Sequence, residues 1–202
     1  GLQAHGIDLD PSNVAAAEAL ARKMGLIVQC TQGDASKFRL TGRQFDLIRA
    51  SQILEHLTDP AGFLTHLFEL QPSGGHLILD CPNNEAAFWL IKNRIRKWFG
   101  RVDFYNSMKI NQHLWGFSRK GLSLLLTKAG YQVLLCRDYA MADTLFQPET
   151  EFWYPTLRKG LRYAVQNKDI YCLLRASIRF FDKATSMTLH RGMGLVALAK
   201  KP

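Results

Sequence analysis

The 202-residue sequence lacks any uninterrupted apolar run near the roughly 18–20 residues that a membrane-spanning helix needs. Its N-terminus also lacks a basic stretch followed by an apolar run, so we expect no signal peptide. An initiating Met is missing too, and the chain opens almost directly on a strand-like segment. We therefore expect the start of the protein to be missing from this sequence.

Cysteines at metal-binding or redox spacing are absent. The four cysteines are widely spread, with no Cys-x-x-Cys motif and no Cys-His ligand spacing: Cys30, Cys81, Cys136 and Cys172. Disulfides and metal ligation are the alternatives, but this distribution favours free, buried thiols in a reducing cytosol. We expect a cytoplasmic protein, peripheral at a membrane under one alternative described below.

Acidic residues are scarce in the second part of the chain. Residues 1–90 hold 6 basic and 10 acidic residues, a net charge of −4. Residues 91–202 hold 20 basic and 7 acidic residues, a net charge of +13. The first part has the balance of an ordinary α/β core, whereas the second part favours an anionic neighbour.

Strand-like and helix-like segments alternate along the chain. Asp10-Pro11 and Asp59-Pro60 are typical helix starts, and Ser118 is a third predicted cap. The pattern predicts helices at 11–24, 60–70 and 118–129, with strands at 4–9, 26–30, 45–50, 76–80, 131–136 and 195–199. Such alternation favours a parallel sheet with helices on both faces.

Aromatic and basic residues are mixed from residue 84 onward, and residues 170–183 form a second amphipathic helix pattern. Three interpretations are open: a lid of helices packed on the core, an interfacial helix on anionic lipid, and nucleic-acid binding. The amphipathic spacing favours the lid or the membrane surface. We find no nucleic-acid motif and expect no nucleic-acid partner.

Acidic residues follow the first two predicted strands. Asp8 stands where a carboxylate can accept both hydroxyls of a ribose, and Asp10 is the better candidate for the helix cap. Asp34 is placed to accept a hydrogen bond from an exocyclic amine. The alternative for Asp8 is a cap, and the alternative for Asp34 is a simple turn residue.

Glu55 and His56 follow the strand at 45–50, and His113 and Tyr105 belong to a segment expected to fold over the same edge. His56 and His113 are candidate general bases, with a structural role as the alternative for each. We predict no metal, because a lone Glu-His pair lacks a third ligand. Arg49 is unusual, because a charge in a central strand is costly unless it is paired.

Taken in order, several stretches resemble the class I S-adenosylmethionine-dependent methyltransferases. They are GIDLDPSNV (6–14), GDA (33–35), FDLIRASQILEHLTDP (45–60), LQPSGGHLILDCPN (70–83), HLWGFSRKGLSLLLTKAGYQV (113–133) and GLVALAKKP (194–202). The resemblance covers almost the whole chain. It is greatest to the branch with Leu-Glu-His after the fourth family strand and Pro-Asn after the fifth.

The resemblance implies a Rossmann-like, doubly wound, mostly parallel α/β sheet with an antiparallel C-terminal strand. It implies one domain over residues 1–202, with helical insertions at about 84–112 and 140–190. S-adenosylmethionine is the implied cofactor. The implied cofactor-binding residues are Asp8 and Leu9 at the ribose, Asp34 and Ala35 at the adenine, and Ser51 and Gln52 at the methionine end.

Three departures from the family pattern stand out. The glycine-rich loop that should precede Asp8 is absent, so we expect the first family strand and helix to be missing and the cofactor cradle to be incomplete. The turn at 72–75 is Pro-Ser-Gly-Gly rather than Pro-Gly-Gly. Quinone-pathway O-methyltransferases of similar type carry Glu where this chain has Gln52, which argues against a carboxylate metal site like theirs.

The predicted function is methyl transfer from S-adenosylmethionine to a small-molecule or lipid-linked acceptor. The alternatives are a truncated or degenerate fold acting as a non-catalytic binding module, and a nicotinamide-dependent oxidoreductase. The oxidoreductase also uses a strand-end acid, but it explains neither the Pro-Ser-Gly-Gly turn nor the C-terminal strand pair.

Overall fold

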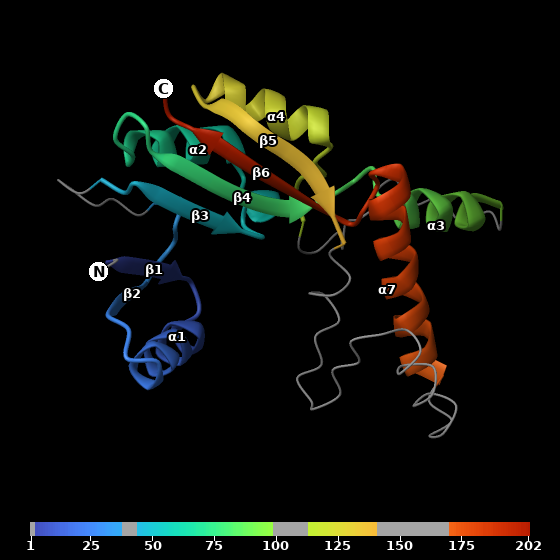
Figure 1. Ribbon diagram of the computed structural model, residues 1–202, viewed down its shortest axis with the longest axis horizontal. Coiled ribbons are helices and arrows are strands. Elements are labelled where there is room, and N and C mark those ends of the chain that lie inside the picture. The colour runs from blue at the N-terminus through green and yellow to red at the C-terminus, as the bar shows by residue number, and fades with distance from the viewer. Residues whose placement is uncertain (1–2, 38–43, 99–112, 141–169) are drawn as a thin grey trace. The chain divides into compact units, whose positions relative to one another are not determined.

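The computed structural model describes residues 3–37, 44–98, 113–140 and 170–202 (Figure 1). Tyr105 and large parts of the two predicted insertions lie outside the described residues. The chain divides into two compact units, Gly1–Arg43 and Gln44–Pro202.

The first unit is a strand–helix–strand motif. Strand β1 (Ala4–Asp8) pairs in parallel with β2 (Val28–Gln32), and helix α1 (Pro11–Lys23) connects them. Asp10 caps α1 as predicted, because its carboxylate accepts a hydrogen bond from the backbone N–H of Ser12. Two residues after the helix, Gly25 adopts the left-handed conformation (φ 66°) that is typical of a helix C-terminus.

Strand β2 begins two residues later than the sequence pattern predicts. The backbone N–H of Leu26 donates to the carbonyl of Ala21 at 2.9 Å, so Leu26 still belongs to the closing turn of α1. The apolar character of residues 26 and 27 indicated a strand, but the helix C-terminus uses this part of the backbone.

The second unit holds a four-stranded sheet in the order β3-β4-β6-β5. Its strands are β3 (Leu47–Ser51), β4 (His76–Pro82), β5 (Gln132–Tyr139) and β6 (Gly194–Lys200). Strand β3 pairs in parallel with β4, whereas β6 runs antiparallel to both β4 and β5. The predicted α/β fold with an antiparallel C-terminal strand is confirmed.

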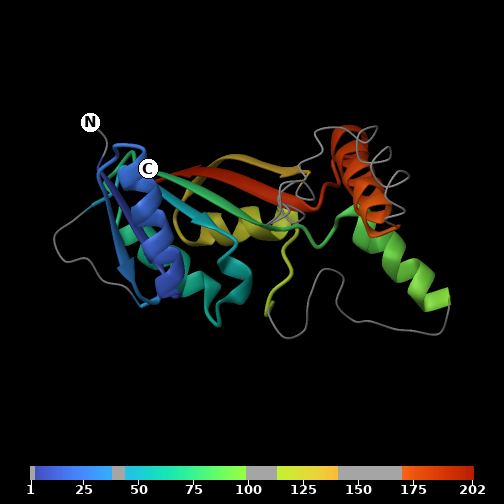
Figure 2. The same ribbon diagram turned by 90° about the horizontal axis from the view of Figure 1, so that it is seen from below.

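Helices α2 (Pro60–Glu69) and α4 (Arg119–Lys128) lie on the same face of this sheet (Figure 2). Both start at the predicted caps, Asp59 and Ser118. Helices α3 (Ala87–Trp98) and α7 (Ile170–Leu189) are the described parts of the two predicted insertions. Within the described ranges, no helix combines the length and apolar character needed to cross a bilayer.

Alternating side chains of the central strands form the core beneath α2 and α4. Leu77, Leu79 and Cys81 of β4 are buried, and their register partners Ala199, Ala197 and Leu195 of β6 are buried as well. Fully buried leucines of the two helices complete the layer: Leu64, Leu122 and Leu126. The period of two along each strand therefore assigns one sheet face to the core.

Two polar anchors fix the C-terminal part of the chain to the sheet. Asp138 of β5 accepts hydrogen bonds from the Arg119 guanidinium (2.8 Å), the Ser186 hydroxyl (2.9 Å) and the Gly192 N–H (2.8 Å). The Lys201 ammonium donates to the carbonyls of Phe68 and Gln71, both at 2.8 Å, and so closes the end of α2. Asp138 was not singled out from the sequence.

Candidate functional site

The carboxylate of Asp8 lies at the carboxyl end of β1 and is oriented by its own turn. Its Oδ1 accepts hydrogen bonds from the Asp10 N–H at 2.8 Å and the Asn13 amide at 3.3 Å. Among the described residues no hydrogen bond reaches Oδ2, which leaves that oxygen for a ligand hydroxyl. Leu9, the next residue, is 70% exposed.

Asp34 follows β2 and is occupied by its own loop. Its Oδ1 accepts from the Ser36 hydroxyl (2.6 Å) and the Ser36 N–H (2.9 Å), and its Oδ2 pairs with Lys37 at 3.4 Å. The Ser36 hydroxyl and N–H hold the pKa of the Asp34 carboxyl below its ordinary value. Neighbouring Ala35 is half-buried. This geometry is what the turn alternative predicts, and contacts to adenine stay a prediction.

Ser51 and Gln52 converge on one carboxylate at the carboxyl end of β3. The Ser51 hydroxyl and the Gln52 side-chain amide both donate to Oδ2 of Asp80 at 2.9 Å, and the Gln52 N–H donates to the Asp80 carbonyl. Gln52 has φ 52°, a left-handed conformation that is uncommon for any residue except glycine. Asp80 therefore holds Gln52 in a conformation of the kind found at functional sites.

Asp80 is a site residue that the sequence analysis missed. The register of β3 on β4 places Ser51 opposite Asp80. The signal in the sequence was an acidic residue at the end of the strand predicted at 76–80. The Asp80 carboxylate also lies 3.9 Å from the Arg49 guanidinium, so the unusual charge in this strand has an acidic partner. In the second unit β3 is an edge strand, and the Arg49 side chain is 70% exposed, so its burial cost is small.

Glu55 is buried in the short helix η1 (Leu54–His56) that follows β3. Glu55 is 1% exposed, and among the described residues neither of its carboxylate oxygens receives a hydrogen bond. Burial raises the pKa of Glu55, and the negative charge of Asp80 adds to the rise, whereas the nearby backbone N–H of Glu55 itself and the charge of His56 oppose it. The Glu55 carboxyl is therefore harder to ionise than an exposed carboxyl.

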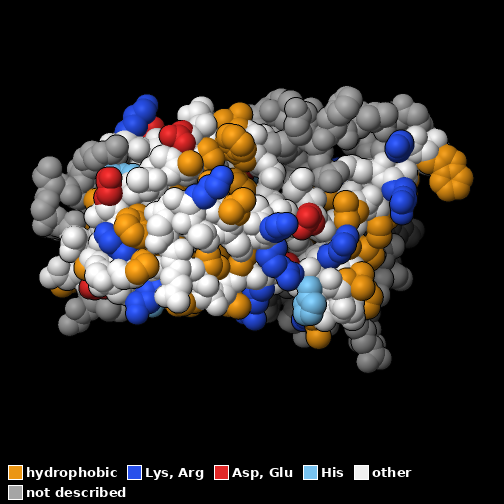
Figure 3. Space-filling view, turned by 90° about the horizontal axis from the view of Figure 1, so that it is seen from above, with side chains coloured by type: hydrophobic (Ala, Val, Ile, Leu, Met, Phe, Trp, Pro, Cys, Tyr) orange, Lys and Arg blue, Asp and Glu red, His pale blue; other side chains and the backbone are white. Residues whose placement is uncertain are grey.

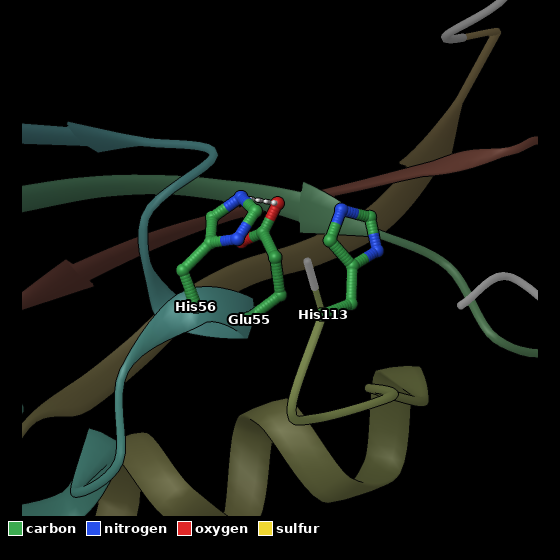
Figure 4. Close-up of side chains that lie close together, drawn as sticks. All are labelled: Glu55, His56 and His113. Carbon is green, nitrogen blue, oxygen red and sulfur yellow. Dashed lines mark ion pairs between the residues drawn. The ribbon is translucent and has the colours of Figure 1, made fainter. Parts of the chain in front are cut away.

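His56 and His113 flank the Glu55 carboxylate, as Figure 4 shows. His56 Nε2 lies 3.8 Å from Glu55 Oε1, and the two imidazole rings meet edge to face at a centroid distance of 4.9 Å. The segment after His113 is fixed on η1, because the N–H groups of Leu114 and Trp115 both donate to the Glu55 carbonyl. The prediction that this segment folds over the edge near His56 agrees with this contact.

The reason given for excluding a metal does not hold. His113 supplies the third group that the sequence pair lacked, and one ligand atom from each of Glu55, His56 and His113 lies within 4.8 Å of the others. Ligand atoms of a tetrahedral zinc ion lie about 3.4 Å apart, so this trio would have to contract around an ion. Gln52 does not join the trio, because its amide donates to Asp80.

The structure thus places the predicted residues in separate groups. Asp8, Leu9, Asp34 and Ala35 belong to the first unit, at the carboxyl ends of β1 and β2. In the second unit, Ser51 and Gln52 gather at Asp80, while His56 and His113 gather at Glu55. The second unit therefore offers a hydrogen-bonded strand end and a cluster of three ionisable side chains.

The family model described as "Methyltransferase domain" matches residues 1–135. A ubiquinone biosynthesis O-methyltransferase of Cereibacter sphaeroides (strain ATCC 17029) is 30% identical over 89 residues, covering 44% of this chain and 36% of the relative. The enzyme of that name from Rhodopseudomonas palustris (strain HaA2) is 30% identical over 128 residues, covering 58% and 49%. The chain thus spans between about a third and a half of the length of these relatives.

Solved structures share the fold. The [4+2]-cyclase SpnF superposes with a TM-score of 0.59 at 17% identity, over 100% of this chain and 66% of that chain. Phosphoethanolamine N-methyltransferase 2 of Haemonchus contortus, solved with S-adenosyl-L-methionine, gives a TM-score of 0.60 at 14% identity, over 100% and 44%. At these identities the likeness shows the fold alone.

Proposed function

Since this chain belongs to the methyltransferase domain family, we propose that it serves S-adenosylmethionine-dependent transfer of a methyl group to a small-molecule or lipid-linked acceptor. Asp8 carries the proposal. It lies within the matched residues, and its carboxylate is oriented at a strand end with Oδ2 available for a hydroxyl.

The residues fit the cofactor unevenly. Asp8 and Leu9 suit a ribose, because an oriented carboxylate stands beside an exposed apolar side chain. Asp34 is a poorer partner for the adenine amine, since both its oxygens already have partners. Ala35, Ser51 and Gln52 are proposed to contact the adenine ring and the methionine end, and Asp80 is proposed to position Ser51 and Gln52.

When bound, the cofactor supplies an activated methyl group on a sulfonium. The task left to the protein is to align the acceptor in line with that methyl group and to exclude water. A base is needed only when the acceptor must lose a proton. His56 is the first candidate, because its side chain is 43% exposed and can therefore meet an acceptor. His113 is the second.

An O-methyl acceptor is favoured for two reasons. First, the curated relatives are named as ubiquinone biosynthesis O-methyltransferases. Second, a hydroxyl acceptor must lose a proton, and His56 and His113 are candidate bases for that step. A quinone-like acceptor with a lipid tail would also account for the apolar and basic character of residues 84–98.

The test is calorimetric titration of S-adenosylmethionine and S-adenosylhomocysteine into a form whose N-terminus carries the glycine-rich strand and helix. Asp8→Ala should weaken binding at least tenfold, because a hydrogen bond to a charged group contributes about 1.5–3 kcal/mol. Asp10→Ala is the matched control. It removes the α1 cap, costing about 1 kcal/mol of stability, and should leave affinity unchanged.

Equal affinity of wild type and Asp8→Ala would contradict the proposed ribose contact. Absence of binding to either compound would favour the non-catalytic binding module. The cyclase SpnF is a reminder that this fold is not restricted to methyl transfer. Turnover with catechol-like acceptors, followed by release of S-adenosylhomocysteine, separates the enzyme from the binding module.

A further inference from the structure

Helix α3 exposes a ridge of large apolar side chains. Ile91 is 48% exposed, Ile95 is 52% exposed and Trp98 is 88% exposed. These residues stand at i, i+4 and i+7, so they share one side of the helix. A ridge of this kind is unexpected on a surface that faces only water.

The first turn of α3 already has a packing partner. Phe88 and Trp89 pack against the buried pair Ala86 and Met193, and Lys92 lies over the Trp89 ring at 5.0 Å from its centroid. The helix is therefore fixed to the second unit by its first turn, and its Ile91–Ile95–Trp98 ridge is exposed beyond that turn.

The charge of α3 has one sign. Residues 87–98 contain four basic residues and no acidic residue. Arg94 lies next to the ridge, three residues after Ile91 and four before Trp98, and both Arg94 and Lys97 are exposed. Figure 3 shows apolar and basic side chains side by side on the surface of the part of the second unit that carries α3 and α7.

From this juxtaposition we infer that α3 docks on an anionic phospholipid surface, with the Ile91–Ile95–Trp98 ridge at the acyl boundary and Arg94 and Lys97 at the headgroup phosphates. An amphipathic helix with Trp and branched aliphatic residues on one side and only basic charges has the composition of an interfacial helix. Basic side chains such as Arg94 reach the headgroups while their stems stay in apolar surroundings.

A nucleic acid fits this ridge less well. Binding of single strands relies on flat aromatic side chains on which bases stack, whereas Ile91 and Ile95 offer branched aliphatic surface. The inference deepens the proposed function, because a lipid-linked acceptor would be met at the surface on which α3 docks. It rests on the proposed function only for that acceptor, and the docking itself is measured without cofactor.

The experiment is co-sedimentation of the full chain with phosphatidylcholine vesicles and with vesicles that also contain phosphatidylglycerol. We expect binding to the anionic vesicles only. Arg94→Glu/Lys97→Glu should weaken it at least about 30-fold, because each basic residue near an anionic surface contributes about 1 kcal/mol. The matched control is Lys120→Glu/Lys128→Glu on α4, which changes the net charge equally. Its binding to the anionic vesicles should fall less than that of the α3 variant.

The apolar ridge is tested in parallel. Ile95→Ser should weaken vesicle binding about tenfold, since burying such a side chain contributes about 1.5–3 kcal/mol. Leu124→Ser on α4 is the matched control, because Leu124 is 54% exposed and Ile95 is 52% exposed. Brominated lipids should quench the fluorescence of the wild type more than that of Trp98→Phe.

Several outcomes would overturn the inference. These are absence of vesicle binding, equal binding to neutral and anionic vesicles, and equal losses in the α3 and α4 variants. Binding of a short single-stranded RNA with the same sensitivity to Arg94 and Lys97, and none to vesicles, would assign the helix to nucleic acid. Cofactor titration of Arg94→Glu/Lys97→Glu should be unchanged, so failure of docking is distinguishable from failure of the proposed function.

Discussion

Replacing Glu55 by Met is expected to stabilise the second unit. Glu55 is 1% exposed, and its carboxylate receives no hydrogen bond from the described residues. A buried polar group without a hydrogen bond costs about 1–3 kcal/mol, and Met fills a similar volume without that cost. We expect the free energy of unfolding at pH 7 to rise by about 1–3 kcal/mol.

The gain should depend on pH in one direction. Burial raises the pKa of Glu55 above its ordinary value of 4.5, so between that value and the folded-state pKa the folded protein binds a proton that the unfolded chain releases. The contribution of Glu55 to stability is therefore fully present below pH 4.5 and is lost as pH rises through the folded-state pKa. The difference between Glu55→Met and wild type should widen as pH rises across this window.

Urea unfolding followed by tryptophan fluorescence measures this difference. Every tryptophan follows residue 43, so the signal reports on the second unit alone. Glu55→Gln should remove the pH dependence and give a smaller gain, and Glu69→Met, at an exposed position, should change stability by less than about 0.5 kcal/mol. A less stable Glu55→Met protein in the presence of a chelator would refute the reasoning. Zinc-dependent stabilisation of wild type alone would assign the carboxylate to a metal.

Three further substitutions test the polar anchors by the same unfolding assay. Asp80→Ala should cost about 3 kcal/mol and weaken cofactor binding, because Gln52 loses its acceptor; Asp80→Asn should recover part of both, and unchanged affinity would contradict a positioning role. Asp138→Ala should cost about 3 kcal/mol, because Arg119 and two further donors lose their acceptor; a loss below 1 kcal/mol would contradict the anchor. Lys201→Met should cost about 2 kcal/mol, and an unchanged unfolding midpoint would show that the carbonyls do not need it.

The helix starts were predictable because their signals are local. Asp10, Asp59 and Ser118 each accept a backbone hydrogen bond within three residues, so the sequence carries the whole interaction. The first and last residues of the strands were less predictable, because pairing with a neighbouring strand decides where a strand begins and ends. Strand β5 runs on to Tyr139, past the predicted end at Cys136, because Tyr139 pairs with Gly194 of β6.

The candidate site divides along the same line. Glu55 and His56 were visible as neighbours in the sequence, but His113 is brought to them by backbone hydrogen bonds to the Glu55 carbonyl. Asp80 ends the strand predicted at 76–80, but its pairing with Ser51 could be found only from the register of β3 on β4. Long-range pairing, which a single sequence does not specify locally, is thus what completes both groups.

Strand β6 lies between β4 and β5 although it follows both in the chain. During synthesis, β3 can pair with β4 early, but β5 has no sheet neighbour until residues 194–200 have emerged. Until then Leu77 and Leu79 of β4 lack their partners Ala199 and Ala197 of β6. The unpaired edge of β4 can therefore pair with other chains. The first unit has no such delay, because β1, α1 and β2 are consecutive. Assembly of the second unit is therefore expected to end with β6, one of its two central strands.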